Sequence, residues 1–253
     1  MEIDQTTADF IRRHAMDDVA ILALQAAKYP DVDMPAALNQ IAGRQRMRAK
    51  VPLWAATEGI VYPAHLPLEQ CSSEATARYK AELAIQTGEE RHTMADLTGG
   101  FGIDCAFLSP LFGRATYVER QKALCETARH NFALLGLHNI DIRHADSVEY
   151  LEQMEPVDLI FIDPARRDNH GGKTVAIGDC EPDVAALEPL LLEKARQVWV
   201  KLSPMLDIAQ ALHTLKHVQE AHVVSVANEC KELLLVLSRE ATLPAERVPL
   251  HCA

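Results

Sequence analysis

The chain of 253 residues is 48% hydrophobic, carries a formal net charge of −11 and has a pI of about 5.4. This composition is ample for a folded core, while the acidic balance argues against broad electrostatic attraction to nucleic acid. The sequence has no signal peptide, no stretch of about eighteen apolar residues and no C-x-x-C pair among its six cysteines. We therefore expect a cytoplasmic protein without a membrane span, a disulfide framework or a metal site.

Residues 1–68 predict a small helical module followed by a connector. Apolar residues recur at three- and four-residue spacing over residues 7–29, which indicates one amphipathic helix. A second helix is expected over residues 35–51, between two prolines. Residues 52–68 contain three prolines and one glycine. We expect an irregular connector there, with a short strand at residues 59–62.

Residues 69–240 predict a second domain in which strands and helices alternate. Ser72 or Ser73 offers an N-cap to a helix that continues to about Thr87. Strands are expected at residues 93–97, 115–119, 140–144, 159–162 and 197–202, and the helices between them start near residues 104, 122, 148 and 183. Such alternation predicts a parallel sheet that is covered by helices on both faces and joined by right-handed crossovers.

The last two strands are expected at residues 223–226 and 233–237, and their six-residue link predicts an antiparallel hairpin. A mainly parallel α/β sheet whose last strand is antiparallel resembles the Rossmann-like fold of class I S-adenosylmethionine-dependent methyltransferases. Residues 241–253 have the composition of a linker-like tail, consistent with a connection to a further C-terminal domain.

Ligands of an open α/β sheet bind beyond the carboxyl ends of the strands, so the strand ends carry the candidate site. The first strand ends in residues 96–102, Asp-Leu-Thr-Gly-Gly-Phe-Gly, which are similar to methyltransferase motif I. The resemblance implies that Gly100 and Gly102 admit the methionine part of the cofactor. It also implies cofactor-binding roles for Thr98 and for Asp96, which would orient the turn or the cofactor's amino group. The alternative is an ordinary strand-to-helix turn.

Two further strand ends carry acidic residues. Glu119 lies 23 residues after Asp96 and is placed to accept hydrogen bonds from both ribose hydroxyls of a nucleoside cofactor. A surface glutamate is the alternative. Asp146 and Ser147 follow the third strand, where Asp146 could accept a hydrogen bond from the adenine amino group. Asp146 could equally be a helix N-cap.

The fourth strand ends in Asp163-Pro164-Ala165-Arg166. This segment resembles the Asp/Asn-Pro-Pro-aromatic motif of methyltransferases that act on planar amines, with alanine and arginine in the last two positions. The resemblance implies that the Asp163 side chain and a backbone carbonyl at Pro164 accept hydrogens from the target nitrogen and align its lone pair. The missing aromatic ring removes a surface on which a flipped base would stack.

Three other features concern the substrate. The Asp-Pro-Ala-Arg segment is also similar to RNA 5-methyluridine methyltransferases, but residues 200–205 lack their cysteine nucleophile, which excludes carbon-5 methylation by that route. Arg166 and Arg167 could hold a phosphate, with a salt bridge within the loop as the alternative. The long loop over residues 166–182 suggests a substrate-closing lid. Glu229, in the final hairpin, could reach substrate or remain solvated.

The motif I segment, Glu119, residues 163–167 and the final hairpin together resemble bacterial class I methyltransferases that carry a THUMP-like domain, over residues 41–240. The most specific parts of this resemblance are residues 72–74, 163–167 and 228–232. The resemblance implies S-adenosylmethionine as cofactor, and RNA as partner because THUMP domains elsewhere accompany RNA modification. We therefore expect an RNA methyltransferase, with a base nitrogen favoured as acceptor and Asp163 positioning it. RNA binding by these residues alone is expected to be weak.

Three alternatives remain. The chain could be a non-catalytic adenosylmethionine-binding module, or a methyltransferase that acts on a small molecule or a protein. A nicotinamide oxidoreductase is disfavoured, because Cys105 stands where the third glycine of a G-x-G-x-x-G motif would be.

Overall fold

A computed structural model describes residues 3–86, 91–166 and 177–253, the side chains of residues 65, 66 and 166 excepted. The helices are α1 (Gln5–Arg13), α2 (Val19–Leu24), α3 (Met34–Lys50), α4 (Pro52–Ala56), α5 (His65–Gln70), α6 (Glu74–Gln86), α7 (Ile103–Leu108), α8 (Lys122–Leu134), α9 (Ser147–Gln153), α10 (Val184–Lys194) and α11 (Ile208–Thr214). The strands are β1 (Thr93–Asp96), β2 (Arg114–Glu119), β3 (Ile140–His144), β4 (Val157–Ile162), β5 (Ala165–Arg166), β6 (Cys180–Glu181), β7 (Ala195–Leu202), β8 (Val218–Val226), β9 (Glu229–Ser238) and β10 (Leu250–Cys252).

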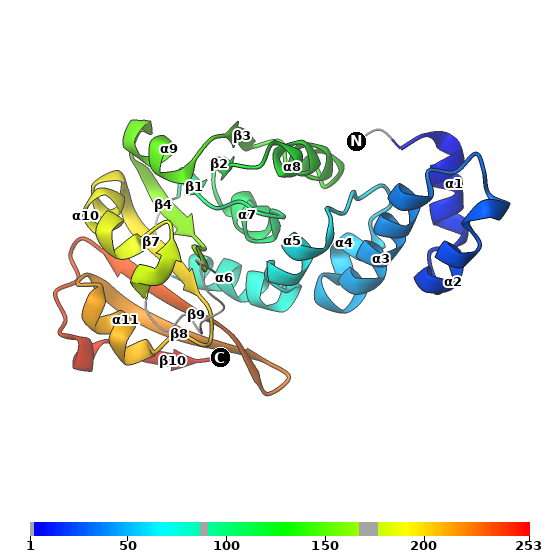
Figure 1. The fold of residues 1–253 in the computed structure, drawn as a ribbon. Coiled ribbons are helices and arrows are strands. Elements are labelled where there is room, and N and C mark those ends of the chain that lie inside the picture. The colour runs from blue at the N-terminus through cyan, green and yellow to red at the C-terminus, as the bar shows by residue number, and fades with distance from the viewer. Residues whose placement is uncertain (1–2, 87–90, 167–176) are drawn as a thin grey trace.

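Eight strands form one sheet in the order β10-β8-β9-β7-β4-β1-β2-β3 (Figure 1). β9 pairs antiparallel with both β7 and β8, and the other strand pairs of this sheet are parallel. The expected Rossmann-like α/β sheet with one antiparallel strand is therefore confirmed. β10 was not expected: within residues 241–253, residues 250–252 pair with β8 at the edge of the sheet.

The link between β8 and β9 is shorter than expected. Both strands run longer than the apolar segments from which they were predicted, so only Ala227 and Asn228 lie between them. Their φ angles are 53° and 64°. Positive φ at both central residues is what a two-residue type I′ hairpin requires, and asparagine tolerates it well.

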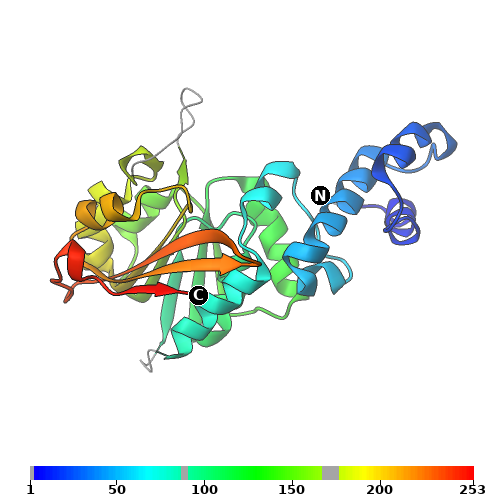
Figure 2. The same cartoon turned by 90° about the horizontal axis from the view of Figure 1, so that it is seen from below.

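The strands β1, β4, β7 and β9 each divide their side chains between two buried clusters, as the two-residue period of a strand requires. In β4, Ile160 and Ile162 pack in the cluster that includes residues of α9, α10 and α11. Leu159 and Phe161 point the other way, into the cluster that includes residues of α6 and α7. Helices therefore cover both faces of the sheet, and Figure 2 shows α6 running along the β8 side of the molecule.

The amphipathic pattern over residues 7–29 does not form one helix, contrary to the prediction. α1 ends at Arg13, and α2 begins at Val19 after a new N-cap. The Asp18 carboxylate accepts the backbone N–H groups of Ala20 at 2.8 Å and Ile21 at 3.1 Å. Such local side-chain bonds compete with a continuous helix, which explains the break. Figure 1 shows α1 to α3 projecting away from the sheet.

The short strand predicted at residues 59–62 is also wrong. The Asn131 side chain of α8 bonds both the N–H and the C=O of Val61, each at 2.9 Å. Gln40 of α3 does the same for Tyr62, at 2.8 and 2.9 Å. These backbone groups are thus satisfied by amide side chains and not by a neighbouring strand. The connector is thereby fixed between α3 and α8.

Among the described residues, no disulfide joins the cysteines. Within the described residues, no helix has the length and apolar character needed to cross a membrane.

The turn after β1 leaves no room for a side chain at Gly99. A Cβ there would lie 2.2 Å from Cε2 of Tyr117, whose side chain is fully buried. We expect Gly99→Ala to lower the free energy of unfolding by about 1–3 kcal/mol, as overpacking of a core does, measured by urea denaturation. At Gly178 a Cβ would meet no atom of the described part of the chain within 4 Å. Gly178→Ala is the matched control and should change stability by less than about 0.5 kcal/mol. Equal effects of the two substitutions would refute this packing argument.

Candidate active site

The turn that follows β1 lies between the ends of β2 and β4, the two neighbours of β1 in the sheet. Its backbone continues the pairing on both sides: the N–H of Leu97 donates to the Phe161 carbonyl at 3.0 Å, and that of Gly99 to the Val118 carbonyl at 2.8 Å. Gly100 and Gly102 have φ angles of +55° and +89°. These left-handed conformations favour glycine and let the chain turn sharply into α7.

Asp96, the last residue of β1, is almost fully buried. Its Oδ1 accepts the N–H of Thr98 at 3.1 Å, so the side chain holds the turn, one of the two roles expected for it. Burial raises the pKa of Asp96 well above its usual range, and the nearby Asp104 carboxylate adds to the rise. The hydroxyl of Thr98 in turn accepts the N–H of Asp163 at 2.6 Å. Thr98 therefore links the turn to the end of β4.

Glu119 ends β2 and faces the same turn. Its Oε2 accepts the N–H of Gly100 at 3.0 Å, and its Oε1 accepts the N–H of Gln121 at 2.7 Å. Only 8% of the residue is exposed. Each carboxylate oxygen has a second acceptor position beyond the one used here. Glu119 can therefore accept two further hydrogen bonds from the side of the turn, which is the capacity that a pair of ribose hydroxyls needs.

Asp146 and Ser147 lie at the end of β3, beside β2. Asp146 is the N-cap of α9: its Oδ1 accepts the N–H groups of Val148 at 2.8 Å and Glu149 at 3.3 Å. Ser147 is the first residue of that helix and is partly buried. The N-cap alternative is thus what the side chain does here. Only one of its oxygens makes these bonds, so capping is compatible with a contact to a nucleobase through Oδ2.

Asp163 and Pro164 follow β4. About a third of the Asp163 side chain is exposed, and its carboxylate forms an ion pair with Lys201, at the end of β7. Burial raises the pKa of Asp163, and the Lys201 charge opposes that rise. Burial of Lys201 would favour its neutral form, but the carboxylates of Asp163, Asp104 and Glu232 outweigh it and raise the pKa of Lys201. The ammonium group therefore stays protonated beside Asp163.

For the other predicted substrate residues, Arg166, Arg167 and Glu229, the described residues show no contact with this turn. Arg167 lies outside the described residues, and so does the side chain of Arg166, whose backbone is in the short strand β5. Most of the loop expected to be a lid lies outside them as well. Glu229 begins β9, is largely exposed and pairs with Lys231 at 2.7 Å.

A buried ionic cluster behind the turn was not predicted. Lys80 of α6 is fully buried and forms ion pairs with Glu232 of β9 and, at 3.1 Å, with Asp104 of α7. The Ser72 hydroxyl donates to Asp104 at 2.6 Å. Burial would raise the pKa of Asp104, but the charges of Lys80 and Lys201 lower it overall. A carboxyl whose pKa falls on folding stabilises the fold above its unfolded pKa, and this contribution is lost as the pH falls through the folded value.

The sequence did contain a signal for this cluster. Ser72 and Glu232 belong to two segments that carry the family resemblance, residues 72–74 and 228–232. Nothing in the sequence joined them, because Lys80 and Glu232 are 152 residues apart. The segments meet only when α6 packs on the sheet beside β9.

Comparison with known proteins agrees with this geometry. The family model for protein-L-isoaspartate(D-aspartate) O-methyltransferases matches residues 71–168, which include the turn, Glu119 and Asp163. An uncharacterized S-adenosylmethionine-dependent methyltransferase of Mycobacterium tuberculosis is 31% identical over 169 residues, covering 66% of this chain and 43% of that protein. The protein-L-isoaspartate O-methyltransferase of Pseudoalteromonas atlantica is 29% identical over 84 residues, covering 33% of this chain and 40% of that protein. The chain thus spans less than half the length of these relatives.

Solved structures extend the likeness to the whole chain. The crystal structure of a proposed methyltransferase from Porphyromonas gingivalis is 35% identical, superposes with a TM-score of 0.82 and is matched over 99% of this chain and 62% of that one. A proposed RNA methyltransferase from Pyrococcus horikoshii matches with a TM-score of 0.55 at 13% identity, covering 75% of this chain and 96% of that one. The second likeness concerns the fold alone.

Breaking the buried cluster should destabilise the protein strongly. We expect Lys80→Met to lower the free energy of unfolding by about 3–5 kcal/mol, because it leaves the carboxylates of Asp104 and Glu232 buried without their cation. Lys122 of α8, which is exposed and lies 3.9 Å from Glu126, provides the control. Lys122→Met should change stability by less than about 1 kcal/mol, as is usual for exposed ion pairs. Denaturant unfolding of the three proteins measures both values, and a Lys80→Met variant as stable as the control would contradict the role given to Lys80.

Proposed function

We propose that this chain, which belongs to the class I S-adenosylmethionine-dependent methyltransferases, transfers the cofactor's methyl group to a nitrogen of an RNA base. The observation that carries this activity is the position of Glu119 and Asp163. They come from the ends of strands on either side of β1: the Glu119 carboxylate accepts the N–H of Gly100, and the backbone N–H of Asp163 donates to the Thr98 hydroxyl. One carboxylate is thereby placed to bind a nucleoside, and the other lies at the opposite side of the same turn.

The residues around the turn fit the cofactor. When bound, S-adenosylmethionine supplies a methyl group on a positively charged sulfur, which a nucleophile can attack directly. Glu119 accepts the ribose hydroxyls with the acceptor positions that Gly100 and Gln121 leave open. A Cβ at Gly100 would meet only one atom within 4 Å, the Thr98 carbonyl oxygen at 3.7 Å. The space beside Gly100 is thus open to the methionine part of the cofactor, and Asp146 accepts the adenine amino group.

Asp163 orients the acceptor. Its carboxylate and the backbone carbonyl of Pro164 accept hydrogen bonds from the amine acceptor. These bonds direct the nitrogen lone pair towards the methyl group. Lys201 holds the carboxylate in place by an ion pair, and its charge opposes the rise in the pKa of Asp163 that burial causes. The nitrogen loses its proton after transfer, and Asp163 lies beside it to accept that proton.

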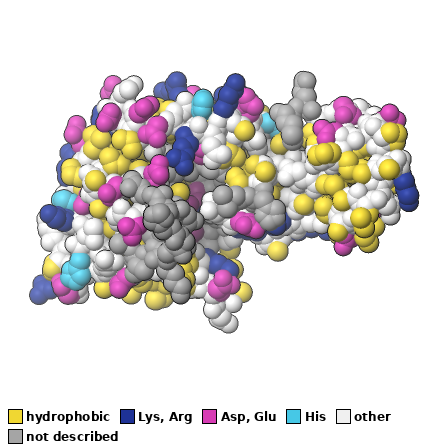
Figure 3. Space-filling view, in the orientation of Figure 1, with side chains coloured by type: hydrophobic (Ala, Val, Ile, Leu, Met, Phe, Trp, Pro, Cys, Tyr) yellow, Lys and Arg dark blue, Asp and Glu magenta, His cyan; other side chains and the backbone are white. Residues whose placement is uncertain are grey.

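RNA is proposed as the substrate from the family resemblance, with recruitment by residues outside this chain. The surface offers little to a polyanion: acidic and basic side chains are mixed on the face shown in Figure 3, and the net charge is −11. Arg44 and Lys50, two of the four cations clustered in α3, donate to backbone carbonyls of Ala55 and Leu68. A cytoplasmic location, where RNA is found and cysteines stay reduced, is part of this proposal.

Methylation of a protein carboxylate is the second candidate, favoured by the family model that matches residues 71–168. That match covers the cofactor-binding segments, which acceptors of different chemistry share. At the acceptor position stands Asp163, an anion that binds hydrogen-bond donors. A carboxylate acceptor carries no hydrogen to donate and would be repelled there. An amine acceptor is therefore the better fit.

Transfer of a radiolabelled methyl group to fractionated cell extract tests both candidates. We expect label in the RNA fraction, sensitive to ribonuclease and resistant to protease. Asp163→Ala should lower the rate by about a hundredfold or more, because the acceptor loses its alignment, while binding of adenosylhomocysteine is unchanged. Asp31→Ala, at an exposed carboxylate between α2 and α3, is the control and should keep full activity.

Two results would count against this function. Label that stays in the Asp163→Ala reaction would remove Asp163 from the mechanism. Label that is released by protease and by mild base would assign the chain to protein carboxylates instead of RNA.

A further inference from the structure

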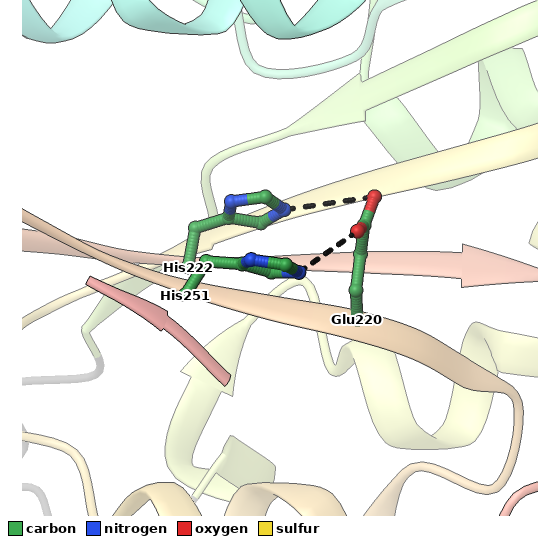
Figure 4. A group of neighbouring side chains, drawn as sticks. All are labelled: Glu220, His222 and His251. Carbon is green, nitrogen blue, oxygen red and sulfur yellow. Dashed lines mark ion pairs between the residues drawn. The ribbon is translucent and has the colours of Figure 1, made fainter. Parts of the chain in front are cut away.

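A cluster of two histidines and one glutamate lies away from the turn, on the strands at the opposite edge of the sheet. Glu220 and His222 belong to β8, and His251 belongs to β10 (Figure 4). One ligand atom from each residue lies within 4.8 Å of the others. β9, β7 and β4 separate β8 from β1, so the cluster is not part of the proposed methyl-transfer site.

The register of the two strands creates this cluster. β8 and β10 are parallel, and His222 is the register partner of His251. Neighbouring residues in register project from the same face of a sheet, and Glu220, two residues before His222, shares that face. The imidazole rings stack with their centroids 4.8 Å apart and a 20° angle between their planes. Figure 4 shows both rings directing a nitrogen towards the Glu220 carboxylate.

His222 is the residue that points to a ligand. It is 3% exposed, and its buried Nε2 has no hydrogen-bond partner among the residues that the structure describes. The nearest carboxylate oxygen of Glu220 is 3.6 Å away, too far for a hydrogen bond. A buried imidazole nitrogen without a partner is costly in a folded protein, and coordination of a cation would satisfy it.

A contact on the other side of the His222 ring orients Nε2 for metal coordination. The Tyr79 hydroxyl of α6 lies 2.8 Å from its Nδ1. In the tautomer whose Nδ1–H donates to the Tyr79 oxygen, the Nε2 lone pair faces Glu220 and His251. Metal-binding histidines commonly have such a partner on the other ring nitrogen, which fixes the tautomer and the ring.

The two separations between the histidine nitrogens and the Glu220 oxygens suit a small cation, and all three ligand atoms lie within 4.8 Å of one another. Four-coordinate Zn²⁺ with bonds of about 2.0–2.1 Å separates its ligand atoms by roughly 3.3–3.4 Å. In the cluster, Nε2 of His251 lies 3.2 Å from one Glu220 oxygen and Nε2 of His222 lies 3.6 Å from the other. About half of the His251 side chain is exposed, so its ring can adjust and water can occupy a fourth position. Two imidazoles and one carboxylate favour late divalent transition metals over Mg²⁺ or Ca²⁺.

We propose that Glu220, His222 and His251 bind a divalent transition-metal ion of the zinc type, which fastens β10 to β8. The sequence suggested no metal site here because His222 and His251 are 29 residues apart and meet only through strand register. A bound metal ion would link the three-residue strand β10 to the sheet, because β8 supplies two of its ligands and β10 supplies the third. The site is therefore structural and independent of the activity proposed above.

Zinc titration of the untagged, chelator-treated chain tests this site. With Zn²⁺ as the only metal and a chromophoric chelator as competitor, we expect each chain to bind one ion. The affinity should be high enough for binding to be stoichiometric at about 10 µM protein. His251→Gln and Glu220→Gln should each weaken binding by about tenfold or more. Co²⁺ in place of Zn²⁺ should give the visible absorption of a four-coordinate site in the wild type and lose it in both variants.

The control uses a histidine of similar exposure outside the cluster. His213 of α11 is exposed and lies 3.9 Å from Glu246. His213→Gln should bind zinc as the wild type does. His251 is at the surface, so its replacement should leave the melting temperature in chelator unchanged and remove only the rise that zinc produces. Equal zinc affinity of the wild type and His251→Gln, or no stoichiometric binding by the wild type, would overturn the proposal.

Discussion

The turn from Asp96 to Gly102 is the constraint on which the proposed site depends, because it is bonded from both neighbouring strands. Glu119 at the end of β2 accepts the Gly100 N–H, and Asp163 at the end of β4 donates its own N–H to Thr98. The buried Tyr117 hydroxyl donates to the Gly100 carbonyl at 2.6 Å. The turn therefore cannot move without displacing both strand ends. This arrangement fixes the separation of the two strand ends before any ligand binds. Ligand binding therefore does not have to supply the free energy of ordering the turn.

Behind the turn, α6 links the proposed methyl-transfer site to the rest of the molecule. Its Lys80 joins Asp104, which follows the turn in α7, to Glu232 in β9. The neighbouring Tyr79 contacts His222 in β8. Lys201 completes the set of charges, since its pKa depends on both Asp163 and the buried carboxylates. A buried cation with several carboxylates tolerates few other arrangements, so the cluster favours one docking of α6 on the sheet.

Much of the fold could be predicted because it depends on residue patterns within short segments of the sequence. The alternation of strands and helices, and the acidic residues at the ends of β1, β2 and β4, follow from periodicity and spacing within short segments. Local chemistry also explains one failure: Asp18 interrupts the first helix through bonds to its own backbone neighbours, which an apolar period does not reveal.

The other features depend on pairs that are distant in sequence. Asn131 holds Val61 from 70 residues away, so residues 59–62 need no strand partner. Lys80 and Glu232 meet through helix packing, and His222 and His251 through strand register. No spacing rule links such residues, because three-dimensional packing alone sets their distance. Asp96 and Glu119 could be predicted because their spacing along the chain places both at the ends of neighbouring strands.

The most direct test of this account is calorimetric titration of adenosylhomocysteine into the wild-type chain and Glu119→Ala. The account predicts measurable binding by the wild type and an affinity at least about tenfold lower in the variant, since hydrogen bonds to a charged group contribute about 1.5–3 kcal/mol each. Glu126→Ala, on the exposed side of α8, should bind as the wild type does. Equal affinity of Glu119→Ala and the wild type would show that the ends of β1 and β2 do not hold the nucleoside, and would contradict the site described here.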